Sequence, residues 1–336
     1  MRVASRPLKP KRIHMPFKLT QLNIVFGLFV LLFVGFLLFL PGFASLGNLL
    51  TLLQNVAFLG ILGMGMALVV IGRGIDISMI ATLAVPPGFM LQMVADGQSI
   101  PFAFVVALGL ALVFGLVNGW LIAYAEVPSL FTTLASGLFL AGLGQAYLFR
   151  LEVVQWPQML DPVAWMGRGS LLGIPTPVLM FALVSGLCAV FLRRVRAGAF
   201  IYGIGDNPNA ARATGLPVRP IMVLEYVLAA LIGVFAGLVM SASVGSMATR
   251  IFNSTMIYDV VLVVVLGGIG LSGGRGGVIN VIMGTLLIGV LLNAMTIMDV
   301  GYSVQNIVKG IVLLVAILAD SIVNPRNEET AQQGDI

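Results

Sequence analysis

The chain has 336 residues, of which 59% are apolar and only 9% are charged, and its mean hydropathy is +1.08. Soluble domains carry about 25% charged residues, and a soluble protein with so few charges would expose large apolar patches and aggregate. The net charge of +5 does not indicate a nucleic-acid partner, because the basic residues cluster in loops that flank apolar segments. The composition therefore predicts an integral membrane protein.

The N-terminal arm, residues 1–18, contains six basic residues and no acidic residue. It resembles the start of a signal peptide, but the apolar run that follows, 22–40, is longer than the roughly 7–15 residues of a signal-peptide core. We therefore interpret this run as a retained transmembrane helix. The single histidine is His14 in this arm and the single cysteine is Cys188 in an apolar run, so we expect no intrachain disulfide, no histidine-based catalytic triad and no metal site in the membrane.

A helix needs about 20 mainly apolar residues to cross a bilayer. On that criterion the sequence predicts an all-α integral membrane protein with about ten transmembrane helices, some of them short or broken by glycine, in one membrane domain at 19–323. The third and eighth segments are short, so each could be a half-helix or a re-entrant segment. The ten segments are 20–40, 49–71, 79–95, 101–125, 130–150, 174–192, 221–244, 256–271, 277–297 and 303–323.

The distribution of positive charge predicts the orientation, because cytoplasmic loops are enriched in lysine and arginine. If the N-terminus is cytoplasmic, then the segment 193–220 and the polar tail 324–336 are also cytoplasmic, and 151–173 is external. Fourteen of the 18 basic residues then lie on the cytoplasmic side and Lys309 lies in the last span. The three external ones are Arg150, Arg168 and Arg250.

Two glycine-rich turns resemble each other, in the stretches 69–78 and 264–274. Each follows an apolar run, breaks it and is followed by another apolar run, and the predicted orientation places both turns on the same side. Glycine-interrupted spans in matching positions mark substrate pathways in transporters, although such turns can also look alike by chance. The glycines expected to break the helices are Gly72, Gly74, Gly267, Gly268, Gly273 and Gly274.

The segment LSGGRGG at 271–277 resembles the signature motif of ABC ATPases, but it lies between two apolar spans. The chain has no G-x-x-x-x-G-K-[ST] phosphate loop. We therefore expect no ATPase site in this chain, so energy for transport must come from another chain or from an ion gradient.

Candidates for the substrate pathway are polar groups next to these breaks. Asp76 and the neighbouring Ser78 lie between two apolar runs, where a charged group is a functional candidate by default; the alternative is that Asp76 caps the next helix. Asp259 could line the pathway or cap its own helix. Thr132 and Thr133 could bind a solute or donate to carbonyls four residues earlier.

Other polar residues in or near the spans have structural interpretations. Glu126 and Glu225 fall at cytoplasmic span ends and are expected to be solvated. Asn55, Asn118 and Asn293 are single amides within spans, for which hydrogen bonding between helices is the default role.

The cytoplasmic segment 193–220 is too long for a passive turn. Asn207 and the following proline predict the start of a short helix near 207–214, which Gly215 ends. Small side chains would allow this helix to seat closely in a partner, and Arg212 could pair with an acidic rim; a solvated loop that only fixes topology is the alternative. The residues assigned to coupling are Gly205, Asn207, Ala210, Ala211, Arg212 and Gly215.

Several stretches together resemble ribose-type ABC permeases, the membrane subunits of binding-protein-dependent importers. LVVIGRGIDIS (68–78) is similar to their stretch after the second helix, and VPSLFTTLASGLFLAGL (127–143) to a threonine-containing helix start. GAFIYGIGDNPNAARATGL (198–216) resembles their cytoplasmic coupling segment, YDVVLVVVLGGIGLSGGRGGVINVIMGTLLIGVLLNAM (258–295) their most recognisable block, and IVKGIVLLVAILADS (307–321) their last helix.

The resemblance implies a permease subunit in the bacterial inner membrane that pairs with a second permease chain as a homo- or heterodimer. It implies a cytoplasmic ABC ATPase, which binds the ATP and magnesium that this chain does not bind, and a periplasmic solute-binding protein. The implied solute is a monosaccharide or related polyol, with nucleosides and branched-chain amino acids as alternatives. A secondary carrier driven by an ion gradient and a membrane enzyme acting on lipid are the competing classes.

The chain departs from the family pattern at four places. Arg73 stands where glycine is usual, Met79 follows Ser78 where Val-Gly is usual, and Asp206 replaces a common glycine. The family's Tyr-Glu-Leu-Asp becomes residues 256–259, in which only Asp259 is kept. The first, second and fourth departures touch the expected solute path, so they bear on which solute is carried.

Overall fold

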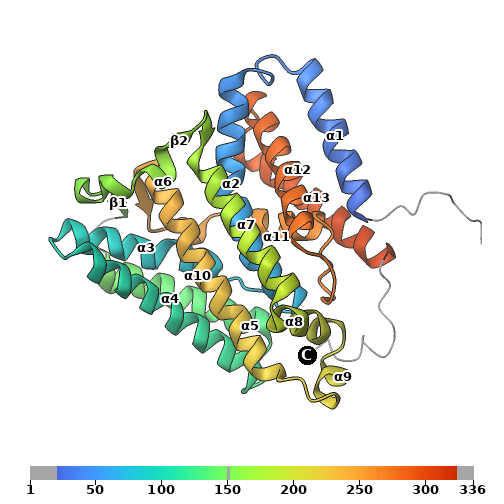
Figure 1. Cartoon of the computed structure of the whole chain (residues 1–336). Coiled ribbons are helices and arrows are strands. Elements are labelled where there is room, and N and C mark those ends of the chain that lie inside the picture. Colours follow the sequence, from blue (N-terminus) through green and yellow to red (C-terminus); the bar gives the residue numbers. More distant parts are fainter. Residues whose placement is uncertain (1–20, 150–151, 324–336) are drawn as a thin grey trace, which may run out of the picture.

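The computed structural model describes residues 21–149 and 152–323, and helices make up most of them (Figure 1). The expectations for the arm at 1–18 and the tail at 324–336 lie outside the described residues. The helices up to the first break in the description are α1 (Gln21–Phe39), α2 (Leu46–Ile71), α3 (Met79–Ala95), α4 (Ile100–Ala123) and α5 (Ser129–Leu143), which the π-helical turn η1 (Gly144–Leu148) extends.

The remaining elements begin with the strand β1 (Val153–Gln155), the 3₁₀ turn η2 (Gln158–Val163), the short helix α6 (Trp165–Arg168) and the strands β2 (Ser170–Leu171) and β3 (Ile174–Pro175). Then follow α7 (Thr176–Arg194), α8 (Arg196–Asp206), α9 (Pro208–Ala213), α10 (Val218–Val244), β4 (Ser246–Ala248), η3 (Ile251–Asn253), α11 (Met256–Leu266), α12 (Val278–Ile297) and α13 (Tyr302–Val323).

Seven helices in the described part of the chain are long and apolar enough to cross a membrane: α1, α2, α4, α5 with its extension, α7, α10 and α12. Shorter apolar helices occur at Met79–Ala95, Met256–Leu266 and Tyr302–Leu318. These ten segments match the ten expected ones in order, so the prediction of an all-α multi-pass membrane protein is confirmed.

Helix α2 forms the centre of the bundle, with 83% of its most apolar stretch buried, whereas only 6% of α1 is buried. Its small residues permit this position: a Cβ atom on Gly63 would lie 2.9 Å from a Val263 methyl of α11. Helix α4 packs against α10 in the same way, because Gly115 and Gly119 face the backbone of α10 at Val227 and Val223. Glycine thus allows helix backbones to approach closely where lipid supplies no hydrophobic driving force.

Helix α11 has 11 residues and is therefore about 16 Å long, roughly half the thickness of a bilayer core. The chain enters this short helix from β4 and η3 and leaves it at Gly267. Helix α3 carries Pro86 and Pro87 in its interior and is buried on nearly all sides.

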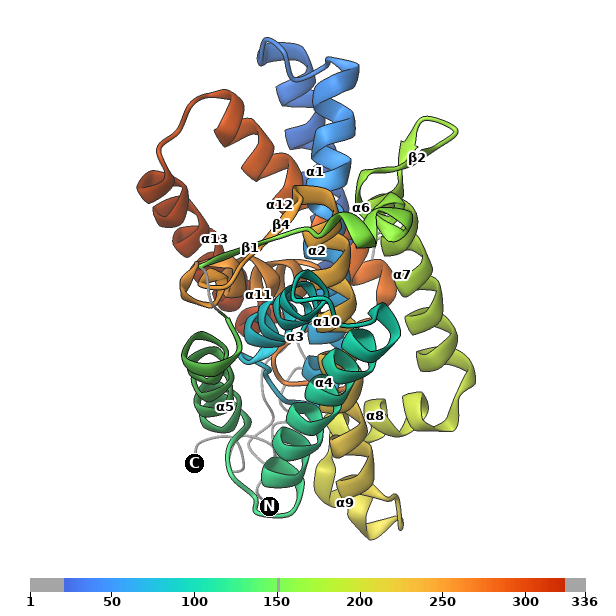
Figure 2. The ribbon, with the colours of Figure 1, turned by 90° about the vertical axis from the view of Figure 1, so that its left-hand side faces the viewer.

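The two ends of the molecule differ (Figures 1 and 2). One end carries α6 and the β2–β3 hairpin, in which Ser170 pairs with Pro175, and we call it the hairpin end. Strand β1 also pairs antiparallel with β4, with Val154 opposite Met247. The opposite end carries α8 and α9, and we call it the coupling end.

The segment 193–220 differs from its expected form. A short helix was expected near 207–214, and α9 occupies that place, but α8 adds 11 helical residues before it. In addition, α7 continues to Arg194 and α10 begins at Val218. The connection is therefore a nearly continuous helical unit.

Candidate functional site

The structure brings three of the expected pathway residues together at the turn between α2 and α3. The Ser78 hydroxyl donates to the Asp76 carboxylate and accepts from the Asn118 amide at 2.9 Å. The Ile77 amide donates to the Thr133 hydroxyl at 3.0 Å. Asp76 is 1% exposed, and the backbone amides of Ser78 and Met79 also donate to its carboxylate. This geometry is that of the helix cap, the second alternative for Asp76.

The hydroxyls of the two α5 threonines bond to carbonyls at the start of their own helix, and the Thr133 hydroxyl also bonds to the Ile75 carbonyl and the Ile77 amide. Thr132 donates to the Pro128 carbonyl at 3.2 Å, and Thr133 donates to the Ser129 carbonyl at 2.8 Å. Both are bonds to the fourth preceding residue, as the structural interpretation requires. Contact of either threonine with a solute stays a proposal.

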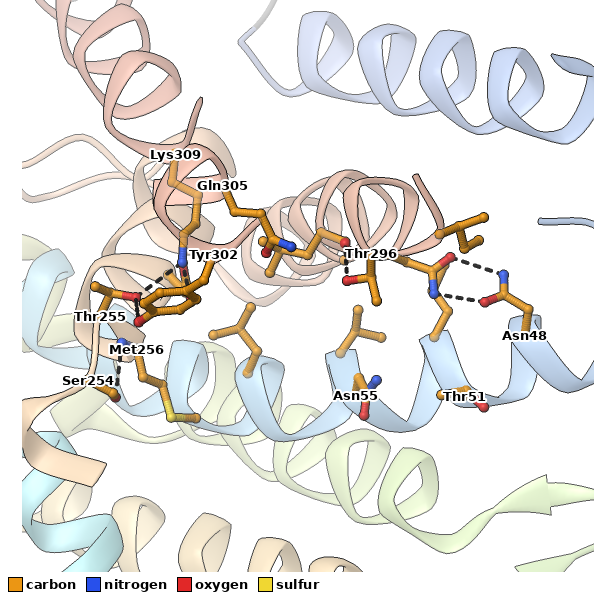
Figure 3. A pocket seen from close by; sticks show the side chains of 18 residues that line it. Asn48, Thr51, Asn55, Ser254, Thr255, Met256, Thr296, Tyr302, Gln305 and Lys309 are labelled. Carbon is orange, nitrogen blue, oxygen red and sulfur yellow. Dashed lines mark hydrogen bonds and ion pairs between the residues drawn. The ribbon is translucent and has the colours of Figure 1, made fainter. Parts of the chain in front are cut away.

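A polar chamber of about 510 Å³ lies between α2, α11, α12 and α13 (Figure 3). It contains Asp259 but none of the other expected pathway residues, so the structure separates Asp259 from the cluster around Asp76. The chamber follows the first half of α2, from Asn48 to Leu59, whereas Ile71 at the far end of this helix lies at the coupling end. Its lining residues with polar side chains are Asn48, Thr51, Asn55, Ser254, Thr255, Asp259, Asn293, Thr296, Tyr302, Gln305 and Lys309.

Helical periodicity explains why these side chains meet. Residues three and four apart share one face of a helix. Helix α2 supplies Asn48, Thr51 and Asn55, and α13 supplies Tyr302, Gln305 and Lys309 from the facing side (Figure 3). Each helix therefore presents a polar stripe to the chamber.

A buried ion pair closes one side of the chamber. Lys309 Nζ lies 2.9 Å from one Asp259 carboxylate oxygen and donates to the other at 3.2 Å. The side chains are 7% and 15% exposed, respectively. Lys309 also donates to the Thr255 hydroxyl at 3.3 Å, and this hydroxyl lies 2.8 Å from the Tyr302 hydroxyl. The pair joins α11 to α13 and leaves this wall without net charge.

Amide groups line another part of the chamber. Asn48 and Asn293 exchange hydrogen bonds at 3.0 and 2.9 Å, which links α2 to α12. This confirms the interhelical role expected of Asn293, and Asn118 fulfils the same expectation through Ser78. Asn55 differs, because its exposed amide has no hydrogen-bond partner among the described residues. Its donor and acceptor groups are free to bind a molecule in the chamber.

The chamber suits a small polar ligand. Its volume lies within the roughly 300–1,000 Å³ of small-molecule pockets, and its wall offers hydroxyl, amide, carboxylate and ammonium groups that hydrogen-bond to hydroxyl-bearing compounds.

At the coupling end, three segments meet at one carbonyl group. The Gly274 amide donates to the Ile71 carbonyl at 2.8 Å, which joins the turn after α11 to the end of α2. A Cβ atom on Gly205 of α8 would collide with this same carbonyl oxygen. Both glycine-rich turns therefore contact each other and α8, so the expectation that they lie on one side of the molecule is confirmed.

Tyr202 adds a second link between α8 and the turn after α11. Its hydroxyl donates to the Gly276 carbonyl at 2.9 Å. Burial raises the pKa of Tyr202, although Arg193 acts in the opposite direction. The hydroxyl therefore stays protonated and able to donate near neutral pH.

The residues assigned to coupling divide into two groups. Asn207 caps α9, with its side chain accepting from the Asn209 and Ala210 amides at 3.0 Å each. Ala210, Arg212 and Gly215 are exposed. The expectation that Ala211 faces a partner is wrong, because its side chain is only 4% exposed and belongs to the chain's own core. Gly205 is likewise buried, against Ile71.

The glycines expected to break the helices lie at or beside the turns. Gly72 follows α2 and Gly267 follows α11, and Gly268, Gly273 and Gly274 have φ values of +92°, +77° and +72°. Such angles favour glycine because it has no Cβ atom. A Cβ atom on Gly74 would collide with the Tyr226 hydroxyl.

The expected position of Glu225 was also wrong. Glu225 was interpreted as solvated, but it is 1% exposed, and its carboxylate lies against Gly72, where a Cβ atom would collide with it. The reason is that α10 begins at Val218, which places Glu225 two turns inside the helix. Glu126, in contrast, is exposed and pairs with Arg219 at 3.2 Å, as expected of a residue at a solvated end.

Sequence reasoning missed most of the chamber. Lys309 was noted only as a basic residue in the last span, and Asn48, Tyr302 and Gln305 were not considered. A signal was present, because 302, 305 and 309 follow the spacing of one helical face, as do 48, 51 and 55.

Apolar helices around a cavity lined by polar side chains are the arrangement expected of a membrane transport protein. The family model described as branched-chain amino acid transport system / permease component matches residues 48–317. The chain belongs to this family.

Curated relatives cover nearly the whole chain. The ribose import permease protein RbsC of Bacillus subtilis (strain 168) is 32% identical over an alignment of 333 residues that covers 95% of this chain and 98% of the relative. RbsC of Escherichia coli (strain K12) is 32% identical over 282 residues, 84% and 88% of the two chains. The galactofuranose transporter permease protein YtfT of the same strain is 31% identical over 275 residues, 82% and 80% of the two chains.

No solved structure matches the chain significantly. The expected resemblance to sugar-type ABC permeases is confirmed by the family and the relatives. The chain is thus a transporter permease subunit and a multi-pass membrane protein.

Proposed function

We propose that the chain is the membrane-spanning subunit of an ABC importer for a monosaccharide or a related polyol. The observation that carries this proposal is the chamber lined by hydroxyl and amide groups, which lies toward the hairpin end of the bundle. At the coupling end, a helical unit contacts both glycine-rich turns. The relatives named for ribose import and galactofuranose transport support the solute class.

The proposed partners occupy the two ends. A periplasmic solute-binding protein delivers the solute at the hairpin end, and a cytoplasmic ATPase, which binds ATP and magnesium, docks on α9. A second permease chain, identical or different, completes the membrane part. Both termini are cytoplasmic and the membrane is the bacterial inner membrane, in keeping with the 14 basic residues assigned to that side.

The solute pathway is proposed to begin at Asp259 in the chamber. The cluster of Asp76, Ser78, Thr132 and Thr133 then acts as a gate through the turn between α2 and α3, because its hydrogen bonds fix that turn in the present conformation. Movement of α8 reaches this turn through the Ile71 carbonyl, which the Gly274 amide and Gly205 both contact.

Uptake by cells tests this function. Cells that contain the chain with its ATPase and binding protein should accumulate at least one radiolabelled monosaccharide among ribose, galactose, xylose and arabinose. Cells that lack only this chain should not. Accumulation of labelled leucine or uridine but of no monosaccharide would replace the sugar by one of the other solute classes.

A further inference from the structure

The ion pair between Asp259 and Lys309 lies in the wall of the chamber and not in a solvated loop. Both side chains line the cavity, yet they are 15% and 7% exposed and contact each other at 2.9 Å. Removing one member of a buried pair leaves an uncompensated charge, which is strongly unfavourable. A helix packing contact could be made at lower cost with apolar side chains, so the position of the pair in a polar cavity suggests a role toward the contents of that cavity.

We propose that the chamber binds the solute directly and that the Asp259–Lys309 pair is its specificity determinant, which accepts neutral polyhydroxylated solutes and rejects net-charged ones. This inference rests on the proposed function and deepens it. A neutral solute can accept from Lys309 and donate to Asp259 through its hydroxyl groups while the two charges stay together. A net-charged solute brings a charge that the neutral wall does not compensate.

Neighbouring groups extend the same pattern of donors and acceptors. The Thr255 and Tyr302 hydroxyls lie 2.8 Å apart beside the pair, and Tyr302 is 60% exposed. Its ring can pack against the C–H face of a sugar while its hydroxyl remains hydrogen-bonded. Across the chamber, the Asn55 amide, which has no hydrogen-bond partner in the described part of the chain, supplies one more donor and acceptor (Figure 3). The site thus joins an aromatic face, a neutral ion pair and a free amide.

The Asp259–Lys309 pair also makes the chamber select sugars over amino acids. A zwitterionic solute would be bound best with its ammonium group on Asp259 and its carboxylate on Lys309. That arrangement requires the two side chains, now 2.9 Å apart, to separate. A hydroxyl-bearing solute requires no such separation, so the chamber favours it.

The test measures the binding of sugars to the full-length chain, which is co-purified with its partner subunits in lipid nanodiscs. The periplasmic binding protein is left out, because its own specificity would otherwise dominate the result. Saturation-transfer NMR detects weak binding of D-ribose and D-galactose and of their acids, D-ribonate and D-galactonate. The wild-type chain should bind at least one neutral sugar and its acid at least tenfold more weakly. In Asp259→Asn, the lone Lys309 charge should reverse or abolish that preference, because the acid's carboxylate supplies the missing partner.

Two further variants keep the test decisive if Asp259→Asn fails to assemble. Asn55→Leu removes an exposed amide that has no partner among the described residues, so the packing of the helices should not change. The affinity for sugar should fall about tenfold, because one hydrogen bond to the solute is lost. Ser303→Ala, on an exposed position of α13 outside the chamber, is the matched control and should bind as the wild type does.

Unchanged sugar binding in Asn55→Leu, or an unchanged preference between sugar and acid in an assembled Asp259→Asn, would overturn the inference. So would the absence of sugar binding in a wild-type preparation that transports monosaccharides, and that result would leave the proposed function intact. Failure of the wild type to transport any monosaccharide would instead overturn the proposed function.

Discussion

Arg73 occupies a backbone conformation that its side chain disfavours. Its φ angle is +76°, a region in which an L-residue costs roughly 1–2 kcal/mol and glycine costs little. The resemblance to ribose-type permeases implies glycine at this position, which would relieve the strain at the turn between α2 and α3.

The Arg73→Gly variant should be more stable than Arg73→Ala, because both lose the contacts of the Arg73 side chain and only glycine relieves the backbone strain. The expected difference is about 1 kcal/mol in the free energy of unfolding, measured as a higher midpoint of thermal unfolding in detergent. Arg73→Ala is the control, because it removes the same side chain but keeps the Cβ atom and hence the strain. Equal stability of the two variants would contradict the backbone explanation.

Gly205 and Gly203 lie on the same helix but differ in their surroundings. A Cβ atom on Gly205 would collide with the Ile71 carbonyl, whereas on Gly203 it would meet only Leu216 Cδ1 at 3.5 Å. Gly205→Ala should therefore push α8 away from both turns, at a cost of about 1–3 kcal/mol from overpacking, and should reduce uptake much more than ATP hydrolysis. Gly203→Ala should leave both unchanged. Similar uptake by the two variants would show that the contact at Ile71 does not transmit movement.

Single residues could be predicted from the sequence where one local rule decides their position. The N-cap at Asn207 followed from an asparagine before a proline, and the bonds of Thr132 and Thr133 followed from their place in the first turns of a helix. Glu225 could not be placed, because its burial depends on where α10 begins and on the contact with Gly72 from α2. Asp259 was identified, but its partner Lys309 is 50 residues away and only the tertiary structure joins them.

The long apolar helices could be predicted from the sequence, whereas the short strands and α8 could not. The strands β1 to β4 have two or three residues each, too few for a period of two to be recognised. Helix α8 contains Gly198, Gly203 and Gly205, which lower helix propensity, and its packing against α7, α10 and α2 overrides that preference.

Helix α9 has one exposed and one buried alanine, and replacing each of them tests whether this helix is the docking element. Ala210 is exposed, whereas Ala211 is 4% exposed within the chain's own core. Ala210→Trp should leave the folded chain and its thermal stability unchanged but should weaken co-purification with the ATPase at least about tenfold, a loss of about 1.4 kcal/mol in binding. Ala211→Trp should lower stability itself by overpacking. Normal ATPase binding by Ala210→Trp would exclude this face of α9 as the docking surface.

The whole molecule has two chemically different ends, and the orientation in the membrane decides what each end can contact. The hairpin end carries Leu172 at the tip of β2–β3, 95% exposed, and the coupling end carries the exposed Asn209. The native Cys188 is buried in α7 and can be replaced by serine to give a cysteine-free background.

In that background, cysteines introduced one at a time at positions 209 and 172 should label from opposite sides of the membrane. A membrane-impermeant maleimide added outside intact cells should label the Leu172→Cys variant and should label Asn209→Cys only after the cells are opened. Labelling of Asn209→Cys in intact cells would reverse the proposed orientation and would move the ATPase site away from α9.

We propose that this chain conducts a sugar and that ATP hydrolysed on another subunit drives the transport. The most direct measurement is uptake of a labelled monosaccharide into proteoliposomes that contain the chain and its ATPase, with the binding protein outside and ATP inside. We predict uptake that requires ATP, ATPase and binding protein together and that persists when ionophores collapse proton and sodium gradients. Uptake that proceeds without ATP and stops when the gradients collapse would contradict ATP-driven import and identify a secondary carrier.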